Sequence, residues 1–136
     1  MELDKAMAVS VSGMNAQSTR LRVIAENLAN ASSTAQTPGG EPYRRKIVTF
    51  KDVFDRTVGA NVVAVGPVQT SSGNLERRYD PAHPAADAQG YVLEPNVNPM
   101  LEAVDMREAQ RSYSANLNVV EAAKSMMGRT IDLLRS

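Results

Sequence analysis

Residues 12–33 read SGMNAQSTRLRVIAENLANASS and form most of a predicted amphipathic helix. From residue 7 onward, apolar side chains recur in steps of three, four or seven, which is the spacing of a one-sided stripe and nearly that of a coiled coil. Asp4 is predicted to cap this helix, and the run from Asn30 to Gly40, which contains Pro38, is predicted to end it. The stripe comprises Met7, Val11, Met14, Leu21, Ile24 and Leu28. Such a face needs a partner.

The last part of the chain carries a similar stripe. Asn98 can cap a helix and Pro99 suits its first position, so the sequence predicts a helix from Pro99 to the C-terminus. At 1.5 Å per residue this helix is roughly 54 Å long, which is more than a compact domain of this size can cover. Part of its stripe should therefore pack against another molecule. Its apolar positions are Tyr113, Leu117, Val120, Met127, Ile131 and Leu134, with a second row at Val119, Ala123, Met126 and Leu133.

Between the two helices, residues 41–98 show a different pattern. The short β-branched runs YRRKIVTF, NVVAVGPVQT, LERRY and GYVLEP are separated by turn-forming residues, which predicts a small antiparallel sheet. The segment DPAHPAADAQG is predicted to be a surface loop. We expect an α+β fold in which long N- and C-terminal α-helices pair as a coiled-coil-like bundle, with a small antiparallel β-rich middle segment. The expected divisions are an N-terminal assembly helix (1–34), a β-rich middle with loops (35–98) and a C-terminal assembly helix (99–136).

Composition narrows the class of protein. The 136 residues carry fifteen Lys and Arg against fifteen Asp and Glu, so the broad positive field of a nucleic-acid binder is missing. The chain has no cysteine, which excludes disulfides and thiolate metal sites. It has neither a basic cluster followed by an apolar core at its start nor an apolar run of about 20 residues. We therefore expect neither a Sec-type secretory precursor nor a membrane-spanning protein.

Three local clusters invite a chemical interpretation. His83, with Asp80 and Asp87, could form a metal cluster, but a single histidine in a proline-rich loop is more often plain surface. No second histidine or cysteine is present to build a nucleophile and base, so we expect no enzyme. The segments Tyr43–Lys46 and Glu76–Tyr79 combine basic and aromatic residues, which could suit nucleic acid or phosphate. In a neutral chain, solvated strand faces or subunit contacts are favoured.

Four segments carry a family resemblance. They are Asn27-Leu28-Ala29-Asn30, Pro42–Lys46, the loop Asp80–Asp87 and YSANL at Tyr113–Leu117, in this order and over nearly the whole chain. With them the sequence resembles the bacterial flagellar basal-body rod proteins, most closely those of the proximal rod. The extra Gln36-Thr37 is a mild departure that lengthens the loop before Pro38.

The resemblance implies a non-enzymatic building block of the flagellar rod, the shaft that crosses the periplasm and passes torque from the membrane ring to the hook. It also implies export through the flagellum-specific type III apparatus without a cleaved signal. The implied partners are other rod proteins, the membrane-ring protein at the rod base, the export apparatus and further copies of the chain. No cofactor, nucleic acid or small-molecule substrate is implied.

The sequence and the resemblance together suggest a subunit interface on the helical stripes. Its expected residues are Met7, Val11, Met14, Leu21, Ile24, Asn27, Leu28, Asn30, Tyr113, Leu117, Val120, Met127, Ile131 and Leu134. The alternative is a soluble adaptor or export-related binding module, whose helices form a closed intramolecular pair. Its partner site would then lie on the sheet, at Arg44, Arg45, Arg77 and Arg78.

Overall fold

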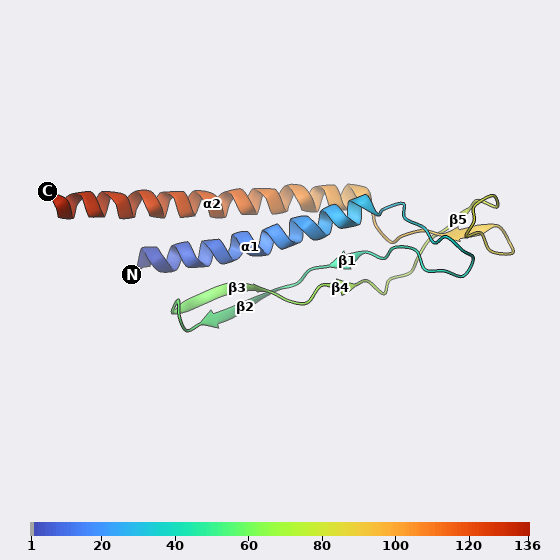
Figure 1. Ribbon diagram of the computed structural model, residues 1–136, viewed down its shortest axis with the longest axis horizontal. Helices are drawn as coiled ribbons and strands as arrows, with labels where there is room; N and C mark the ends of the chain where they lie inside the picture. Colours follow the sequence, from blue (N-terminus) through green and yellow to red (C-terminus); the bar gives the residue numbers. More distant parts are fainter. Residues whose placement is uncertain (1) are drawn as a thin grey trace. The chain divides into compact units, whose positions relative to one another are not determined.

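The computed structural model describes residues 2–136, which form two long helices and six short strands (Figure 1). The chain divides into two compact units, the first assembled from three separate segments and the second from two. The first, here called the hairpin unit, contains the residues up to Leu21, Val48–Pro67 and Arg107–Ser136. The second, the network unit, contains Arg22–Ile47 and Val68–Met106. Both helices contribute to both units, and the α+β prediction is confirmed.

Helix α1 spans Glu2–Ala29. The predicted cap is wrong, because the helix begins before Asp4 and leaves this residue in the first turn. There its carboxylate faces the positive end of the helix dipole. The predicted stop is confirmed: the Asn30 backbone N–H and its side-chain Nδ2 both donate to the carbonyl oxygen of Glu26, at 3.1 and 2.9 Å. These bonds satisfy a carbonyl that the helix end would otherwise leave unpaired.

Helix α2 spans Pro99–Arg135 and begins as predicted. Asn98 Oδ1 accepts hydrogen bonds from the backbone N–H groups of Met100, at 3.1 Å, and Leu101, at 3.4 Å. Proline at the first helical position loses nothing, since its missing N–H would have had no partner inside the helix. The predicted C-terminal helix is therefore confirmed.

The middle of the chain is antiparallel, as predicted, and its strands pair as three separate two-stranded sheets. The pairs are β1 (Lys46–Ile47) with β4 (Gln69–Thr70), β2 (Phe50–Asp55) with β3 (Ala60–Val65), and β5 (Arg77–Tyr79) with β6 (Tyr91–Leu93). The longest strand pair turns at residues 56–59. There the Asp55 carboxylate accepts the N–H groups of Thr57 and Val58, and Gly59 adopts a φ of 74° that suits glycine.

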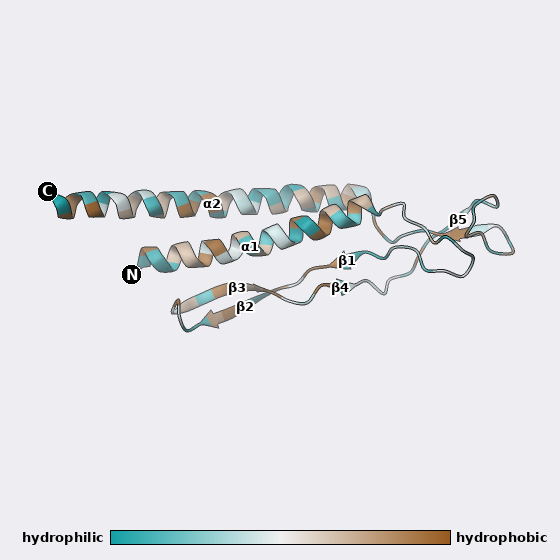
Figure 2. Cartoon of the chain, viewed as in Figure 1, coloured by the Kyte–Doolittle hydropathy of each residue, from teal (hydrophilic) through white to brown (hydrophobic). Residues whose placement is uncertain are grey.

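Small residues build the core of the hairpin unit. Ser10, Gly13 and Ala16 are buried on α1, and Ala109, Val120 and Ala123 are buried on α2. Small side chains let the two helix backbones approach closely. The β2–β3 hairpin is attached to α1 through Ser12, whose Oγ accepts the N–H of Val63 at 3.0 Å. Figure 2 shows the apolar bands recurring along both helices.

Replacing Gly13 tests this close approach. A β-carbon at Gly13 would lie 2.7 Å from Asn116 Nδ2 on α2, whereas a β-carbon at Gly128 would have no neighbour within 4 Å. We expect Gly13→Leu to destabilise the chain by about 1–3 kcal/mol, because the larger side chain must displace the Asn116 side chain or move the helices apart. The matched change Gly128→Leu should be neutral or stabilise by up to about 1 kcal/mol, since leucine is the better helix former. Urea unfolding followed by circular dichroism distinguishes the two, and equal stabilities would contradict the packing.

The core of the network unit is partly polar. Val23 and Ile24 on α1 and Val92 on β6 supply apolar side chains. Asn27 and Glu102, however, are each only 1% exposed and are among the largest fully buried side chains. Burying a polar group destabilises a fold unless the group is fully hydrogen-bonded. Asn27 and Glu102 therefore require particular hydrogen-bond partners at this point of the fold.

Candidate structural and assembly sites

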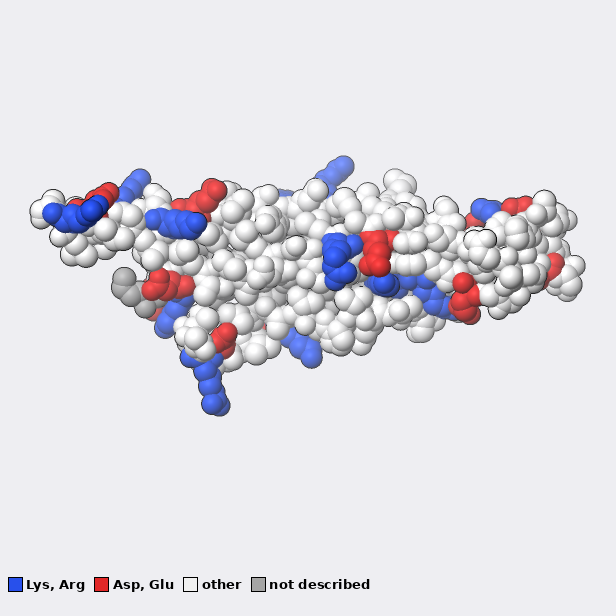
Figure 3. All heavy atoms as spheres, viewed as in Figure 1, with Lys and Arg blue, Asp and Glu red and all other residues white. Residues whose placement is uncertain are grey.

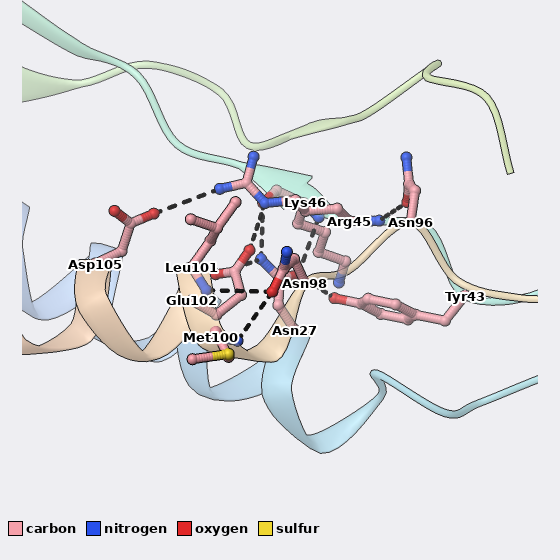
Figure 4. A network of polar contacts seen from close by, with 10 residues as sticks. All are labelled: Asn27, Tyr43, Arg45, Lys46, Asn96, Asn98, Met100, Leu101, Glu102 and Asp105. Carbon is pink, nitrogen blue, oxygen red and sulfur yellow. Dashed lines mark hydrogen bonds and ion pairs between the residues drawn. The ribbon is translucent and has the colours of Figure 1, made fainter. Parts of the chain in front are cut away.

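Asn27 is bonded on all sides inside the network unit (Figure 4). Its Nδ2 donates to the carbonyl of Lys46 at 3.0 Å and lies 3.5 Å from Glu102 Oε2. Its Oδ1 accepts the N–H of Lys46 at 2.9 Å and the hydroxyl of Tyr43 at 2.6 Å. The amide therefore pairs with both backbone groups of Lys46, as a neighbouring strand would. It fixes the start of β1 against the end of α1.

Glu102 is the second centre of this network. Arg45 Nε donates to Glu102 Oε1, and Arg45 Nη2 lies 3.6 Å from Asp105 Oδ2 one turn further along α2. The backbone N–H of Arg45 donates to Asn96 Oδ1 at 2.7 Å. A buried carboxylate is tolerated only with a cation and hydrogen bonds around it, and Arg45 and Asn27 supply them. The first turn of α2 is thereby tied to α1 and to β1 within the network unit.

Every side chain of the first basic segment, Tyr43–Lys46, is bonded within the chain. Tyr43 bonds Asn27, and burial raises the pKa of its hydroxyl, which favours the neutral donor form. Arg44 donates to the carbonyls of Ser71, at 3.4 Å, and Gly73, at 2.9 Å. These contacts, with those of Arg45 and Lys46, show that Tyr43–Lys46 is more than a solvated strand face, and a subunit contact at this segment stays a prediction. The cations are used inside the chain.

The exposed edge of the network is an ion pair between α1 and β1. Lys46 Nζ lies 2.7 Å from Glu26 Oε1, and both side chains are more than one-third exposed. The hydrogen bond from Lys46 lowers the pKa of Glu26, and the same bond raises the pKa of Lys46. Solvent screens such a pair, so its contribution to stability is small.

The pair predicts a small pH dependence with a defined sign. Because the pKa of Glu26 is lower in the folded than in the unfolded chain, the ion pair stabilises the folded chain at pH values above the ordinary carboxyl pKa. This stabilisation is lost as the pH falls through the folded pKa of Glu26. Because the pKa of Lys46 is higher in the folded than in the unfolded chain, the ion pair stabilises the folded chain at pH values below the unfolded lysine pKa. This stabilisation is lost as the pH rises through the folded pKa of Lys46. Urea midpoints measured from acid to alkaline pH should therefore fall at both ends in the wild type. Glu26→Gln should flatten both limbs, and an unchanged profile would contradict the assignment.

His83 links the 80–90 loop to the segment that follows α1. Its Nδ1 accepts the N–H of Ala85 at 2.9 Å, and its Nε2 lies 3.0 Å from Thr34 Oγ1. Because Nδ1 accepts, the neutral ring carries its proton on Nε2 and donates it to Thr34. Asp87 accepts the N–H groups of Gln89 and Tyr91, which lowers its pKa. Across residues 2–136, no group of three or more His, Asp or Glu side chains is placed to hold a metal ion.

The second basic segment lies on β5 and is exposed. Arg77 pairs with Asp87 at 3.1 Å and stacks over the ring of Tyr91, 4.6 Å from its centroid. Arg78 pairs with Glu94 at 2.7 Å. Its charges are thus balanced locally. On the visible face, most charged side chains lie in small groups that contain both signs, on a largely uncharged surface (Figure 3).

The predicted interface residues occupy three kinds of position. Ile24, Asn27 and Val120 are buried within the chain. Half-buried positions are Met7, Met14, Leu21, Leu28, Asn30, Tyr113 and Met127. Exposed positions are Val11, Leu117, Ile131 and Leu134. The structure therefore brings much of the stripe into the chain's own core and leaves its C-terminal part outside.

The end of α2 is the clearest unpartnered surface. From Lys124 to Ser136 every side chain except that of Met127 is exposed. Ile131 and Leu134 continue the stripe of Val120 and are 55% and 82% exposed. Sequence reasoning missed a second exposed group on the first turns of α2, formed by Met100, Leu101 and Val104. The spacing of these apolar residues along the predicted helix could have identified the group from the sequence.

Comparison with known proteins identifies the family. The chain is 48% identical over 134 residues to the flagellar basal-body rod protein FlgC of Agrobacterium fabrum, which covers 98% of this chain and 96% of that protein. The chain belongs to the FlgC family of flagellar basal-body rod proteins. Family members from Salmonella typhimurium and Bacillus subtilis are 41% and 34% identical, over 98% and 94% of this chain and 98% and 95% of theirs.

Two family descriptions match separate parts of this FlgC-family chain. Residues 7–35 match the flagella basal body rod protein family, and residues 88–133 match the C-terminal family of flagellar basal body rod FlgEFG proteins. The first match contains Asn27 and the end of α1, and the second contains Glu102 and nearly all of α2. Among the helices in the described part of the chain, none is long and apolar enough to span a membrane.

Proposed function

We propose that this chain is a structural subunit of the flagellar basal-body rod that assembles helically and is required for flagellum-dependent motility. The observation that carries the proposal is the near-complete coverage of relatives that are themselves named flagellar basal-body rod proteins. The exposed apolar end of α2 supports it, because a single chain gains nothing from leaving Ile131 and Leu134 in water.

The finer role is that of a torque-bearing part of the proximal rod. Contacts between different surface patches of neighbouring subunits continue as an open helical array, which suits a shaft. The Asn27–Glu102 network would keep α1, β1 and α2 in fixed geometry while load passes through the subunit. Residues 1–34 and 99–136 would act as the assembly helices, with residues 35–98 as the β-rich middle.

Partners and location follow as part of the same proposal. Other rod proteins, further copies of this chain and the membrane-ring protein at the rod base are its expected neighbours in the periplasmic space. Delivery would use the flagellar type III apparatus without a cleaved signal. Helices that are weak alone could pass a narrow channel and then fold against neighbours. The role is mechanical, and we propose no catalytic reaction and no cofactor.

The alternative function is a soluble adaptor or export-related binding module. Its proposed partner site used Arg44, Arg45, Arg77 and Arg78, and each of these is bonded to an acid or a carbonyl within the chain. A partner would have to replace those bonds, which weighs against this alternative.

Gene deletion tests the proposal. Cells without the chain should fail to swim and should lack rods beyond the point where this subunit is added, and the intact gene supplied in trans should restore both. An adaptor would instead leave completed rods in some cells and alter only their number. Normal swimming in the deletion strain would exclude the proposed function.

A further inference from the structure

The outer strand of the β2–β3 hairpin is a surface that the chain leaves uncovered. Residues 49–54 are all exposed, whereas β3 is partly buried along most of its length. Both phenylalanines of the chain lie on β2, with Phe50 38% and Phe54 61% exposed. Aromatic side chains gain more than most from burial, so two exposed ones on one strand indicate a surface that a partner covers.

Two hydrogen bonds of β3 show which backbone groups of β2 face outward. Val63, which stands opposite Asp52 in the register, donates its N–H to Ser12 on α1 and not to β2. Gly66 donates its N–H to the carbonyl of Thr49 at 2.8 Å, so that pair is hydrogen-bonded. Bonded and non-bonded pairs alternate along an antiparallel ladder. The backbone groups that point away from β3 are therefore those of Phe50, Asp52 and Phe54.

The outward edge of β2 is open and regular. Across residues 2–136, the N–H groups of Phe50, Asp52 and Phe54 have no hydrogen-bond partner. Strand β3 lies on the α1 side of the hairpin and β2 on the other side (Figure 1). The pairing with β3 is continuous from Phe50 to Asp55, without the proline or bulge that often blocks an edge strand.

This edge indicates an extended strand, and not a helix, as the partner. An added strand can pair with each of the three outward residues through two hydrogen bonds. A helix has its backbone groups bonded internally and would leave the edge unpaired. Alternate side chains of a strand share one face, so the added strand would place apolar side chains opposite Phe50 and Phe54. Opposite Asp52 it would carry a basic or neutral side chain, since like charges in this position are destabilising.

We propose that β2 is a docking edge at which an extended segment of a neighbouring rod subunit adds as a third strand. The contact joins unlike surfaces, an open edge on one subunit and an extended segment on the next, so it continues along a shaft instead of closing. It requires no folded partner before assembly, since a disordered segment can become ordered as it binds. The inference rests on the proposed function and adds a second contact to the one at the end of α2.

Proline at residue 52 tests the backbone edge. Asp52→Pro removes an N–H that the chain itself does not use, and edge strands tolerate proline at such positions. The purified variant should keep the wild-type urea midpoint, whereas Val53→Pro, which removes a hydrogen bond to β3, should lower it. At equal protein levels, cells with Asp52→Pro should nevertheless spread in soft agar at less than about one-tenth of the wild-type rate, because the added strand loses its pairing at this residue. Gln36→Pro, at an exposed residue outside β2 whose N–H is also unbonded, should spread normally.

Side-chain variants distinguish a strand from a helix as the partner. Asp52→Ala keeps the N–H and should lose less than about half of the spreading rate. Phe54→Ser should also reduce spreading, because it removes an apolar contact. A Phe54→Ser strain that fails to spread, beside an Asp52→Pro strain that spreads normally, would identify a partner that covers the face without pairing and would overturn the proposal.

Two further outcomes would also contradict the docking edge. If Asp52→Pro lowered the urea midpoint as much as Val53→Pro, the Asp52 N–H would be bonded inside the chain. If the gene-deletion strain could not swim but both the Asp52→Pro and the Phe54→Ser strains swam normally, the rod function would stand and the docking edge alone would be refuted.

Discussion

Asn27→Ala should unfold the network unit under conditions in which the wild-type chain is stable. The change removes every hydrogen bond of a side chain that is 1% exposed and leaves both backbone groups of Lys46, together with Glu102, without that partner. An unpaired buried polar group costs about 1–3 kcal/mol, so the sum is roughly 3–5 kcal/mol, a large part of the stability of an ordinary domain.

A second variant at residue 27 distinguishes the loss of hydrogen bonds from the loss of side-chain volume. Asn27→Asp keeps the size and the acceptor but removes the donor and faces a second carboxylate, Glu102, across 3.5 Å. It should destabilise the chain about as strongly as alanine does. Asn15→Ala, an exposed change on the same helix, should stay within about 0.5 kcal/mol of the wild type. Urea unfolding measures the free energies. If Asn27→Ala lost less than about 1 kcal/mol, the network would not hold the unit together.

The second large effect is expected on assembly rather than on folding. Ile131→Asp combined with Leu134→Asp should abolish swimming and rod formation, because two carboxylates would occupy the apolar surface proposed for neighbouring subunits. The folded chain should lose less than about 1 kcal/mol, since both side chains already lie largely in water. Swimming in soft agar and electron microscopy of basal bodies measure the loss.

A control with the same charge on another face of α2 makes the result specific. Gln110→Asp combined with Ser114→Asp changes two exposed residues in the same helix and adds the same two charges. This variant should swim. Equal protein levels in both strains must be verified by immunoblot. Normal swimming by the Ile131→Asp, Leu134→Asp strain would contradict the role of the α2 end.

The helices were predictable because their signals are local. The period of the apolar stripe predicted both, and Asn98 with Pro99 predicted the start of α2. Asp4 was misjudged as a cap, since acidic residues favour both the cap and the first turn. The sequence did not predict strand β2 beyond Phe50, because Lys51, Asp52 and Asp55 make this stretch polar. The strand forms because it pairs with β3.

The network was only partly predictable. The family resemblance singled out Asn27, but the sequence assigned it to a subunit interface, whereas its partners Tyr43, Lys46 and Glu102 lie in its own chain. Contacts between residues that lie 16 to 75 positions apart in the sequence leave no periodic pattern in it. One clue was present: Asn27 falls beside Ile24 and Leu28 on the buried side of α1, where a polar residue requires a partner.

Quantitative mass spectrometry of purified basal bodies tests most directly whether the chain is a rod subunit. After the rings are dissolved from the rods, the wild-type chain should remain with the rod proteins at a constant ratio to them. The Ile131→Asp, Leu134→Asp chain should be absent from that fraction although the cell contains it. A wild-type chain found only in the soluble fraction, with intact rods that lack it, would contradict the account.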